Sequence, residues 1–225
     1  MVNTVKTRDR ILQTSLDLFN DQGERAVTTN HIAAAMNIST GNLYYHFRNK
    51  REIISELFRA YENRVRGVLN LPEERSAQIT DMQFYLTEIF RGLWEYRFLH
   101  RDLETLLLAD PQLHEDYRNF YRYCLGQAQS ILMALDQAGI IRADREACED
   151  LALNAWIMIT SWFSFLHCTQ PLTTASGVSE SMLEGGIYQV LSLGKPYLTE
   201  TYREAALALI AEVTTRPDWL DGRMS

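Results

Sequence analysis

The sequence predicts an all-α protein with a small helical domain at the N-terminus and a larger helical domain behind it. Apolar residues recur at helical spacing along most of the 225 residues, and no alternating run bounded by hairpin turns predicts a strand. Glycines, prolines and helix-capping residues separate the periodic segments, which are short at the front of the chain and longer behind. This change in length predicts two parts.

The first four helices are predicted from their caps and breaks. They are expected at about 7–22, from 28 or 29 to 36, from 39 onward, and from 49 to 72. Gly23 suits a left-handed cap at the end of the first helix. Asn37, between the second and third helices, tolerates a positive φ. Ser39 is expected to cap the third helix, because a serine hydroxyl accepts a hydrogen bond from a free N–H group of the first turn.

The rest of the chain is expected to form longer helices. They are placed near 76–97, 102–109, 112–138, 145–168, 180–193 and 198–214. Gly139, residues 169–177 and residues 194–196 serve as breaks. A seam is expected around 71–75, with the fourth helix packing on both parts. By function, the front domain is assigned to residues 1–50 and the rear domain to residues 51–225.

Charge is distributed unevenly between the two parts. The whole chain carries a formal net charge of −7, but residues 1–51 hold seven Lys or Arg and four Asp or Glu, which gives +3. The remainder is therefore −10. A basic head on an acidic body indicates that the head meets phosphate while the body stays in solution.

Cysteine content and apolar runs bear on the compartment. Cys124, Cys148 and Cys168 are odd in number and lack zinc-ligand spacing, and the N-terminus has no apolar segment typical of a signal peptide. We therefore expect a cytoplasmic protein with buried, unpaired cysteines. The apolar run 151–167 is shorter than the roughly 20 residues of a spanning helix, so we expect no membrane partner and a helix that is buried or lies at a dimer interface.

The segment 28–50 has the pattern of two short helices around a tight turn. Ile32, Ala33, Ile38 and Leu43 would pack the two helices together, and the small Ala33 would allow their backbones to approach. The other residues of the second helix are polar, small or aromatic. Such a unit places its second helix in the major groove of DNA, where those side chains reach phosphates and base edges.

This segment resembles the helix-turn-helix of the TetR family of regulators. The resemblance is carried by Ile32-Ala33, by the run 37–47 (Asn-Ile-Ser-Thr-Gly-Asn-Leu-Tyr-Tyr-His-Phe) and by Asn49-Lys50. Ile11, Leu16, Phe19 and Gly23 match the family's first helix, so the resemblance covers about residues 7–60. Two positions depart from the family pattern: Asn37 stands where glycine is usual, and Asn42 where threonine is common.

The resemblance implies a set of DNA-binding residues. Tyr44, His46 and Lys50 would mainly grip phosphates, whereas Thr40, Gly41, Asn42 and Tyr45 would discriminate between sequences. Thr29 and Asn30, which open the second helix, would touch the backbone or one base. For each of these residues, an ordinary role as a cap or a surface side chain is the alternative.

The resemblance also implies a homodimer bound to a palindromic operator, because one recognition helix reads too few bases. The dimer would form through the segments 145–168 and 198–214. The apolar candidates on these segments are Leu151, Ala155, Ile159, Tyr202, Ala205, Ala206, Leu209 and Ile210. Packing within the chain's own core is an equally good interpretation for any one of them.

A regulator of this type needs a pocket for a small molecule, and we expect an apolar or aromatic effector that releases the repressor from DNA. The aromatic-rich candidates for the pocket are Trp94, Phe98, Tyr117, Tyr121, Cys124, Trp156, Trp162, Phe163, Phe165 and His167. Aromatic residues at helical spacing belong more often to a core than to a pocket.

Enzymes form the main alternative class, and the sequence argues against them. It contains no glycine-rich phosphate loop, no nucleophile-elbow motif and no metal-spaced His, Cys or Asp cluster, and no cofactor is expected. A second alternative stays open: a helical scaffold whose head binds protein, or a helical regulator that responds to a protein partner.

Overall fold

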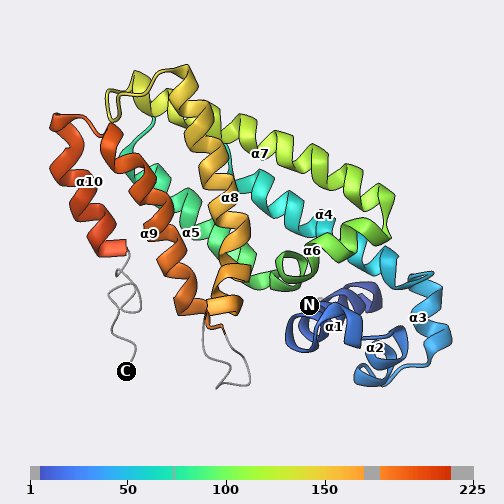
Figure 1. The fold of residues 1–225 in the computed structure, drawn as a ribbon. Coiled ribbons are helices and arrows are strands. Elements are labelled where there is room, and N and C mark those ends of the chain that lie inside the picture. Colours follow the sequence, from blue (N-terminus) through green and yellow to red (C-terminus); the bar gives the residue numbers. More distant parts are fainter. Residues whose placement is uncertain (1–5, 73, 170–177, 214–225) are drawn as a thin grey trace, which may run out of the picture. The chain divides into compact units, whose positions relative to one another are not determined.

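The computed structural model describes residues 6–72, 74–169 and 178–213 and confirms the all-α class (Figure 1). Within these residues there is no strand, only an isolated bridge between Ile141 and Leu198. The elements are α1 Thr7–Gln22, η1 Glu24–Ala26, α2 Thr29–Ala35, α3 Thr40–His46, α4 Lys50–Val68, α5 Ile79–Glu95, α6 Arg97–Ala109, α7 Pro111–Gln137, α8 Arg145–Thr169, α9 Glu180–Gly194, η2 Lys195–Tyr197 and α10 Glu200–Val213.

Most of the predicted helices agree with the structure, and α6 is the largest deviation. Helix α6 begins at Arg97, whereas the sequence predicted a start near 102. Its first turn is stabilised from far along the chain, because the side-chain oxygen of Asn20 in α1 accepts a hydrogen bond from the Phe98 N–H at 3.1 Å. Local sequence shows no cap there. Most of the predicted break at 169–177 lies outside the described residues.

The chain packs into two compact units whose limits interleave along the sequence. The first unit comprises residues 1–64 and 96–117, and the second comprises residues 65–95 and 118–225. Helix α6 and the start of α7 thus belong with the N-terminal helices. The boundary expected after residue 50 was a functional one and divides the chain at a single point. Helices α4 and α7 each contribute residues to both units.

The core of the first unit is built on aromatic side chains. Phe19, Phe47 and Phe98 are fully buried, and the rings of Phe19 and Phe98 lie 5.2 Å apart. Phe98 joins α6 to α1 through this contact. The predicted apolar face of α1 is confirmed, because Ile11 and Leu16 are buried beside Phe19.

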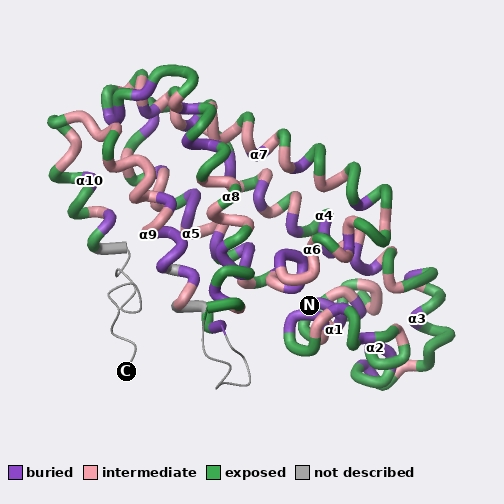
Figure 2. The backbone as a smooth tube through the Cα atoms, in the orientation of Figure 1, coloured by how far each residue is buried: buried purple, intermediate pink, exposed green. Residues whose placement is uncertain are grey.

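The second unit has its core between α5, α8 and α9. Leu93, Phe163, Leu166 and Ile187 belong to this buried cluster. The indole N–H of Trp162 donates to the Met182 carbonyl at 3.2 Å and ties α8 to α9. Figure 2 shows α9 largely buried or intermediate, and α8 with a buried side and an exposed side.

The exposed side of α8 carries large apolar side chains among uncharged polar ones such as Asn154 and Ser161. Ile157 is 53% exposed, and Leu153 and Phe165 are each 40% exposed. Among the described residues, α8 is the one helix long and apolar enough to cross a membrane by length and composition, with 28% of its most apolar window buried. The core helix of a soluble protein meets the same criteria, so these two properties do not assign a membrane.

Candidate nucleic-acid interface

The helix-turn-helix is formed by short-range hydrogen bonds at its caps and turn. At the start of α2 the Thr28 hydroxyl accepts from the His31 N–H at 3.3 Å, and the His31 Nδ1 accepts from the Thr28 N–H at 3.4 Å. In the turn, Asn37 adopts φ 54°, as predicted. The Ser39 hydroxyl accepts from the Asn42 N–H at 3.2 Å, which confirms the predicted cap of α3.

The residues expected to pack the two helices together do so. Ile32, Ala33 and Leu43 are buried, and Ile38 is half-buried. The Ile38 N–H donates to the Ala33 carbonyl at 3.0 Å, which closes the turn. These contacts use one side of α3 for packing and leave the other side exposed.

The exposed side of α3 carries the side chains predicted to read DNA. Thr40, Gly41 and Asn42 are exposed at its start, and His46 is half-buried at its end. Tyr45 is 85% exposed, the largest exposure of any large hydrophobic residue in the described part of the chain. Thr29 and Asn30, at the start of α2, are half-buried and exposed, respectively.

Two neighbouring tyrosines of α3 differ in their surroundings. The Tyr44 hydroxyl lies 3.0 Å from the Thr29 hydroxyl, so a hydrogen bond joins α3 to the start of α2. The Tyr45 ring instead packs edge to face with the His46 ring, with centroids 5.2 Å apart. Tyr44 is therefore oriented by its partner, whereas the Tyr45 hydroxyl extends from an exposed ring.

The Lys50 ammonium, expected to bind a phosphate, is engaged by oxygens of the head. It lies 2.7 Å from the Glu24 carboxylate and donates to the carbonyls of Glu24 at 3.0 Å and Val27 at 2.9 Å. An ammonium has three hydrogens to donate, and three oxygens of the head surround this one. Lys50 thus fastens the start of α4 to the segment between α1 and α2.

Residues of α6 hold the head in a way that the sequence did not indicate. The Arg101 guanidinium donates to the Phe19 carbonyl at 2.6 Å and to the Asn20 carbonyl at 3.2 Å, so it caps the end of α1. The Asp102 carboxylate accepts from the Glu24 N–H at 3.2 Å. Each of these partners is about 80 positions away in the sequence, and no local pattern reveals such a pair.

The predicted effector-binding residues are divided between the two units. Phe98 and Tyr117 belong to the first unit, and the others belong to the second. Phe98 packs on Phe19, and Tyr117 lies 6.2 Å from Phe58 between ring centroids. In the second unit, Phe163 belongs to the core cluster and Trp94 packs against it. The Tyr121 and Trp156 ring centroids lie 5.2 Å apart, and those of His167 and Phe163 lie 4.7 Å apart. Cys124 is buried.

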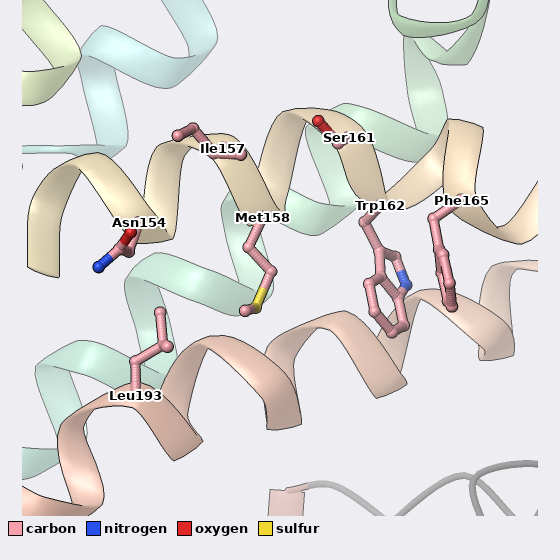
Figure 3. A pocket seen from close by; sticks show the side chains of 7 residues that line it. All are labelled: Asn154, Ile157, Met158, Ser161, Trp162, Phe165 and Leu193. Atoms are coloured by element: carbon pink, nitrogen blue, oxygen red, sulfur yellow. The ribbon is translucent and has the colours of Figure 1, made fainter.

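A groove of about 480 Å³ lies along the exposed side of α8 (Figure 3). It is lined by Asn154, Ile157, Met158, Ser161, Trp162, Phe165 and Leu193. Met158 and Trp162 extend from α8 toward α9, and Leu193 points back from α9 (Figure 3). Trp162 and Phe165 are the predicted effector residues found here. Of the residues predicted for dimerisation on α10, Ala206 and Ile210 are buried within the chain.

Comparison with known proteins gives consistent results over most of the chain. Residues 11–57 match the family model described as bacterial regulatory proteins of the tetR family, and residues 60–206 match the TetR model described as a bacterial transcriptional repressor. A crystal structure of a TetR-family transcriptional regulator from Marinobacter aquaeolei VT8 is 50% identical, with a TM-score of 0.87, over 94% of this chain and 100% of that one.

Two curated relatives are repressors. IcaR, the negative regulator of the biofilm operon icaADBC in Staphylococcus aureus, is 21% identical over 83% of this chain and 97% of its own length. The repressor KstR2 of Mycolicibacterium smegmatis is 30% identical over 46% of this chain and 48% of its own length. Both family models and both relatives thus describe regulators of transcription.

Proposed function

Because this chain belongs to the TetR family of bacterial transcriptional repressors, we propose that it binds a palindromic operator as a homodimer and leaves it when a small apolar or aromatic effector binds. It is a DNA-binding regulator and not an enzyme. Because a bacterial transcriptional repressor meets its operator in the cytoplasm, we propose that it acts there.

The observation that carries the proposal is the division of α3 into two sides. Leu43 is fully buried, whereas Thr40, Asn42 and Tyr45 are exposed together. A helix held by one side on a small core can place its other side in the major groove. We assign base contacts to Thr40, Gly41, Asn42 and Tyr45.

The remaining residues of the interface are assigned to the DNA backbone. Tyr44 and His46 would bind phosphates, and Thr29 and Asn30 would touch the backbone or one base. The bond from Tyr44 to Thr29 supports this assignment, because it fixes the phenol where α2 and α3 meet. We assign Lys50 to bracing the head, since its ammonium is already surrounded by three oxygens.

The exposed apolar side of α8 supports a homodimer. Ile157 and Phe165 are exposed, and after Asp150 the helix carries no charged Asp, Glu, Lys or Arg. Exposed large apolar side chains on an uncharged helix face are typical of protein interfaces. A second copy that covers α8 would also place a second recognition helix for the other half of a palindrome. On α10, the exposed Leu207 and Ala205 stay available for the same interface.

The effector is proposed to bind among the aromatic side chains of the second unit. There the rings of Tyr121 and Trp156 contact each other, with centroids 5.2 Å apart, and Cys124 is buried. To turn a population from 1:99 to 99:1, an effector must favour the non-binding form by about 5.5 kcal/mol. An apolar ligand can supply a difference of that size if it is buried against several aromatic rings in the non-binding form alone.

Selection of duplex DNA by the full chain tests the proposal. Fragments are enriched from the genomic DNA of the source bacterium, and the enriched duplex is titrated by fluorescence anisotropy at several salt concentrations. We expect a two-fold symmetric consensus sequence and two chains per duplex. Affinity should fall steeply with salt, because each neutralised phosphate releases counterions. A complex with one chain per duplex would contradict the homodimer, and no enrichment would contradict operator binding.

A further inference from the structure

The second residue of α1 reaches the end of the recognition helix. The Arg8 guanidinium lies over the Phe47 ring, 4.7 Å from its centroid. The same group donates to the Glu56 carboxylate of α4 at 3.2 Å. One side chain of α1 thus contacts both the residue that follows α3 and a residue of α4.

The contact of Arg8 with Phe47 would affect sequence recognition through the position of α3. Phe47 directly follows α3, is fully buried, and donates its N–H to the Leu43 carbonyl at 3.0 Å. Helix α3 has seven residues, and helices this short are not stable alone. Its direction is therefore set by contacts at its two ends, and Tyr44 and Tyr45 lie within one turn of the Phe47 end.

The contacts of Arg8 occupy one face and two nitrogens of its guanidinium, and 39% of the side chain stays exposed. One face covers the Phe47 ring, and two of its nitrogens approach the same Glu56 oxygen at 3.2 Å. By charge alone Arg8 belongs to the basic surface of the head together with Arg48 and Arg51, which are exposed. The contacts with Phe47 and Glu56 distinguish Arg8 from those two exposed arginines.

We propose that Arg8 is a positioning residue, which holds the end of the recognition helix by covering Phe47 and pairing with Glu56, and that it does not contact a phosphate. This inference rests on the proposed operator binding. It assigns to α1 a part in sequence discrimination that the DNA-binding residues named above do not include.

The chain offers a matched control for this role. Arg59 pairs with the other oxygen of the same Glu56 carboxylate at 2.9 Å, and it is 57% exposed. Loss of Arg59 removes the same charge and an ion pair to the same acceptor, but Arg59 has no described contact with Phe47 or α3. A difference between the two arginines therefore reports on the contact with the recognition helix.

The experiment compares Arg8→Gln, Arg8→Lys and Arg59→Gln with the unmodified full chain. The probes are the duplex that the unmodified chain selects and a shuffled duplex of the same length and composition. We expect Arg8→Gln to weaken binding to the selected duplex by about tenfold, the combined size of an exposed cation–π contact and a surface ion pair. Binding to the shuffled duplex should change less. Arg8→Lys should recover part of the loss, and Arg59→Gln should stay within about twofold.

Salt dependence separates positioning from phosphate contact. A lost phosphate contact lowers the slope of log K against log salt by about 0.9 for each site. We expect Arg8→Gln to keep the slope of the unmodified chain. A slope reduced by that amount, or equal losses on the selected and shuffled duplexes, would overturn the proposal.

Glu56→Gln leaves residue Arg8 unmutated and gives a further test, in which net charge and positioning change the DNA affinity in opposite directions. Removal of a negative charge beside DNA should strengthen binding if only net charge matters. If the Arg8–Glu56 pair positions α3, the variant should instead bind the selected duplex more weakly. Stronger binding would contradict the proposal. If the unmodified chain selects no duplex, the proposed function fails, whereas equal behaviour of Arg8→Gln and Arg59→Gln overturns this inference alone.

Discussion

The Lys50 ammonium lies 2.7 Å from the Glu24 carboxylate, and this pair joins the start of α4 to the segment that links α1 and α2. Both side chains are largely buried, since 28% of the Lys50 side chain and 11% of the Glu24 side chain are exposed. Two backbone carbonyls, of Glu24 and Val27, share the same ammonium. Lys50 therefore serves the internal structure of the head.

Replacement of Lys50 by Gln should destabilise the head by about 1–3 kcal/mol, because a partly buried carboxylate and two carbonyls lose a charged donor. Operator affinity should fall with it. The slope of log K against log salt should stay unchanged, because no phosphate contact is lost. Thermal unfolding and anisotropy titrations measure the two effects. Arg51→Gln, which removes an exposed charge from the next residue, is the control for net charge. A smaller slope for Lys50→Gln would restore the role expected from the sequence.

Tyr45→Ala should change sequence discrimination without changing stability. The side chain is 85% exposed, so its removal should alter the free energy of unfolding by less than about 0.5 kcal/mol. If Tyr45 reads a base edge, affinity for the selected duplex should fall by about 1–3 kcal/mol, and discrimination at one base pair of each half-site should relax. Repeated selection with the variant measures this change. An unaltered consensus sequence would remove Tyr45 from the base contacts.

Gly186→Ala should destabilise the second unit by about 1–3 kcal/mol through overpacking. A β-carbon on Gly186 would lie 2.6 Å from the Phe90 Cζ and 2.8 Å from the Trp162 Cδ1, closer than two carbons can pack. Gly126→Ala in α7 is the matched control, because its β-carbon would meet no atom within 4 Å. That variant should gain about 0.5–1 kcal/mol from the removal of a helical glycine. Calorimetry of both variants compares them; equal melting temperatures would show that α9 can move away.

Because of His100, the free energy of unfolding should decrease in mild acid. The ring is buried, its Nε2 lies 3.1 Å from the Tyr61 hydroxyl, and burial lowers the pKa of His100 from 6.5 to about 4. Because the folded pKa lies below the unfolded value, the unfolded chain binds the proton first as the pH falls. Stability from this group is therefore complete above pH 6.5 and is lost between pH 6.5 and about 4.

The expected loss from His100 is about 1–2 kcal/mol between pH 6.5 and 5, since one pKa unit corresponds to about 1.4 kcal/mol. Denaturant unfolding as a function of pH measures it. His100→Phe should flatten the curve in this range, whereas His114→Gln, which removes an exposed histidine of α7, should keep its shape. A curve for His100→Phe that parallels that of the unmodified chain would show that other groups cause the acid sensitivity.

The parts of the head that depend on local interactions could be predicted from the sequence. The positive φ of Asn37 and the Ser39 cap of α3 each involve residues a few positions apart, so their residue types are informative. The apolar spacing of Ile32, Ala33 and Leu43 gave the buried side of α2 and α3 for the same reason.

Interactions between distant residues could not be predicted in this way. The start of α6 depends on Asn20, and the environment of Lys50 depends on Glu24, at separations of 78 and 26 positions. Phe98 was expected in a pocket because it is aromatic, but it packs on Phe19 in the core of the first unit. A single sequence gives the type of a side chain and not its partner.

Binding of duplex DNA by the full chain at low ionic strength tests the central claim most directly. An anisotropy titration of the selected duplex should show two chains bound per duplex. Affinity should fall steeply as salt rises, with discrimination against a shuffled duplex that Tyr45→Ala reduces. A chain that stays monomeric and binds neither duplex at low salt would contradict the assignment of α3 as a DNA-reading helix.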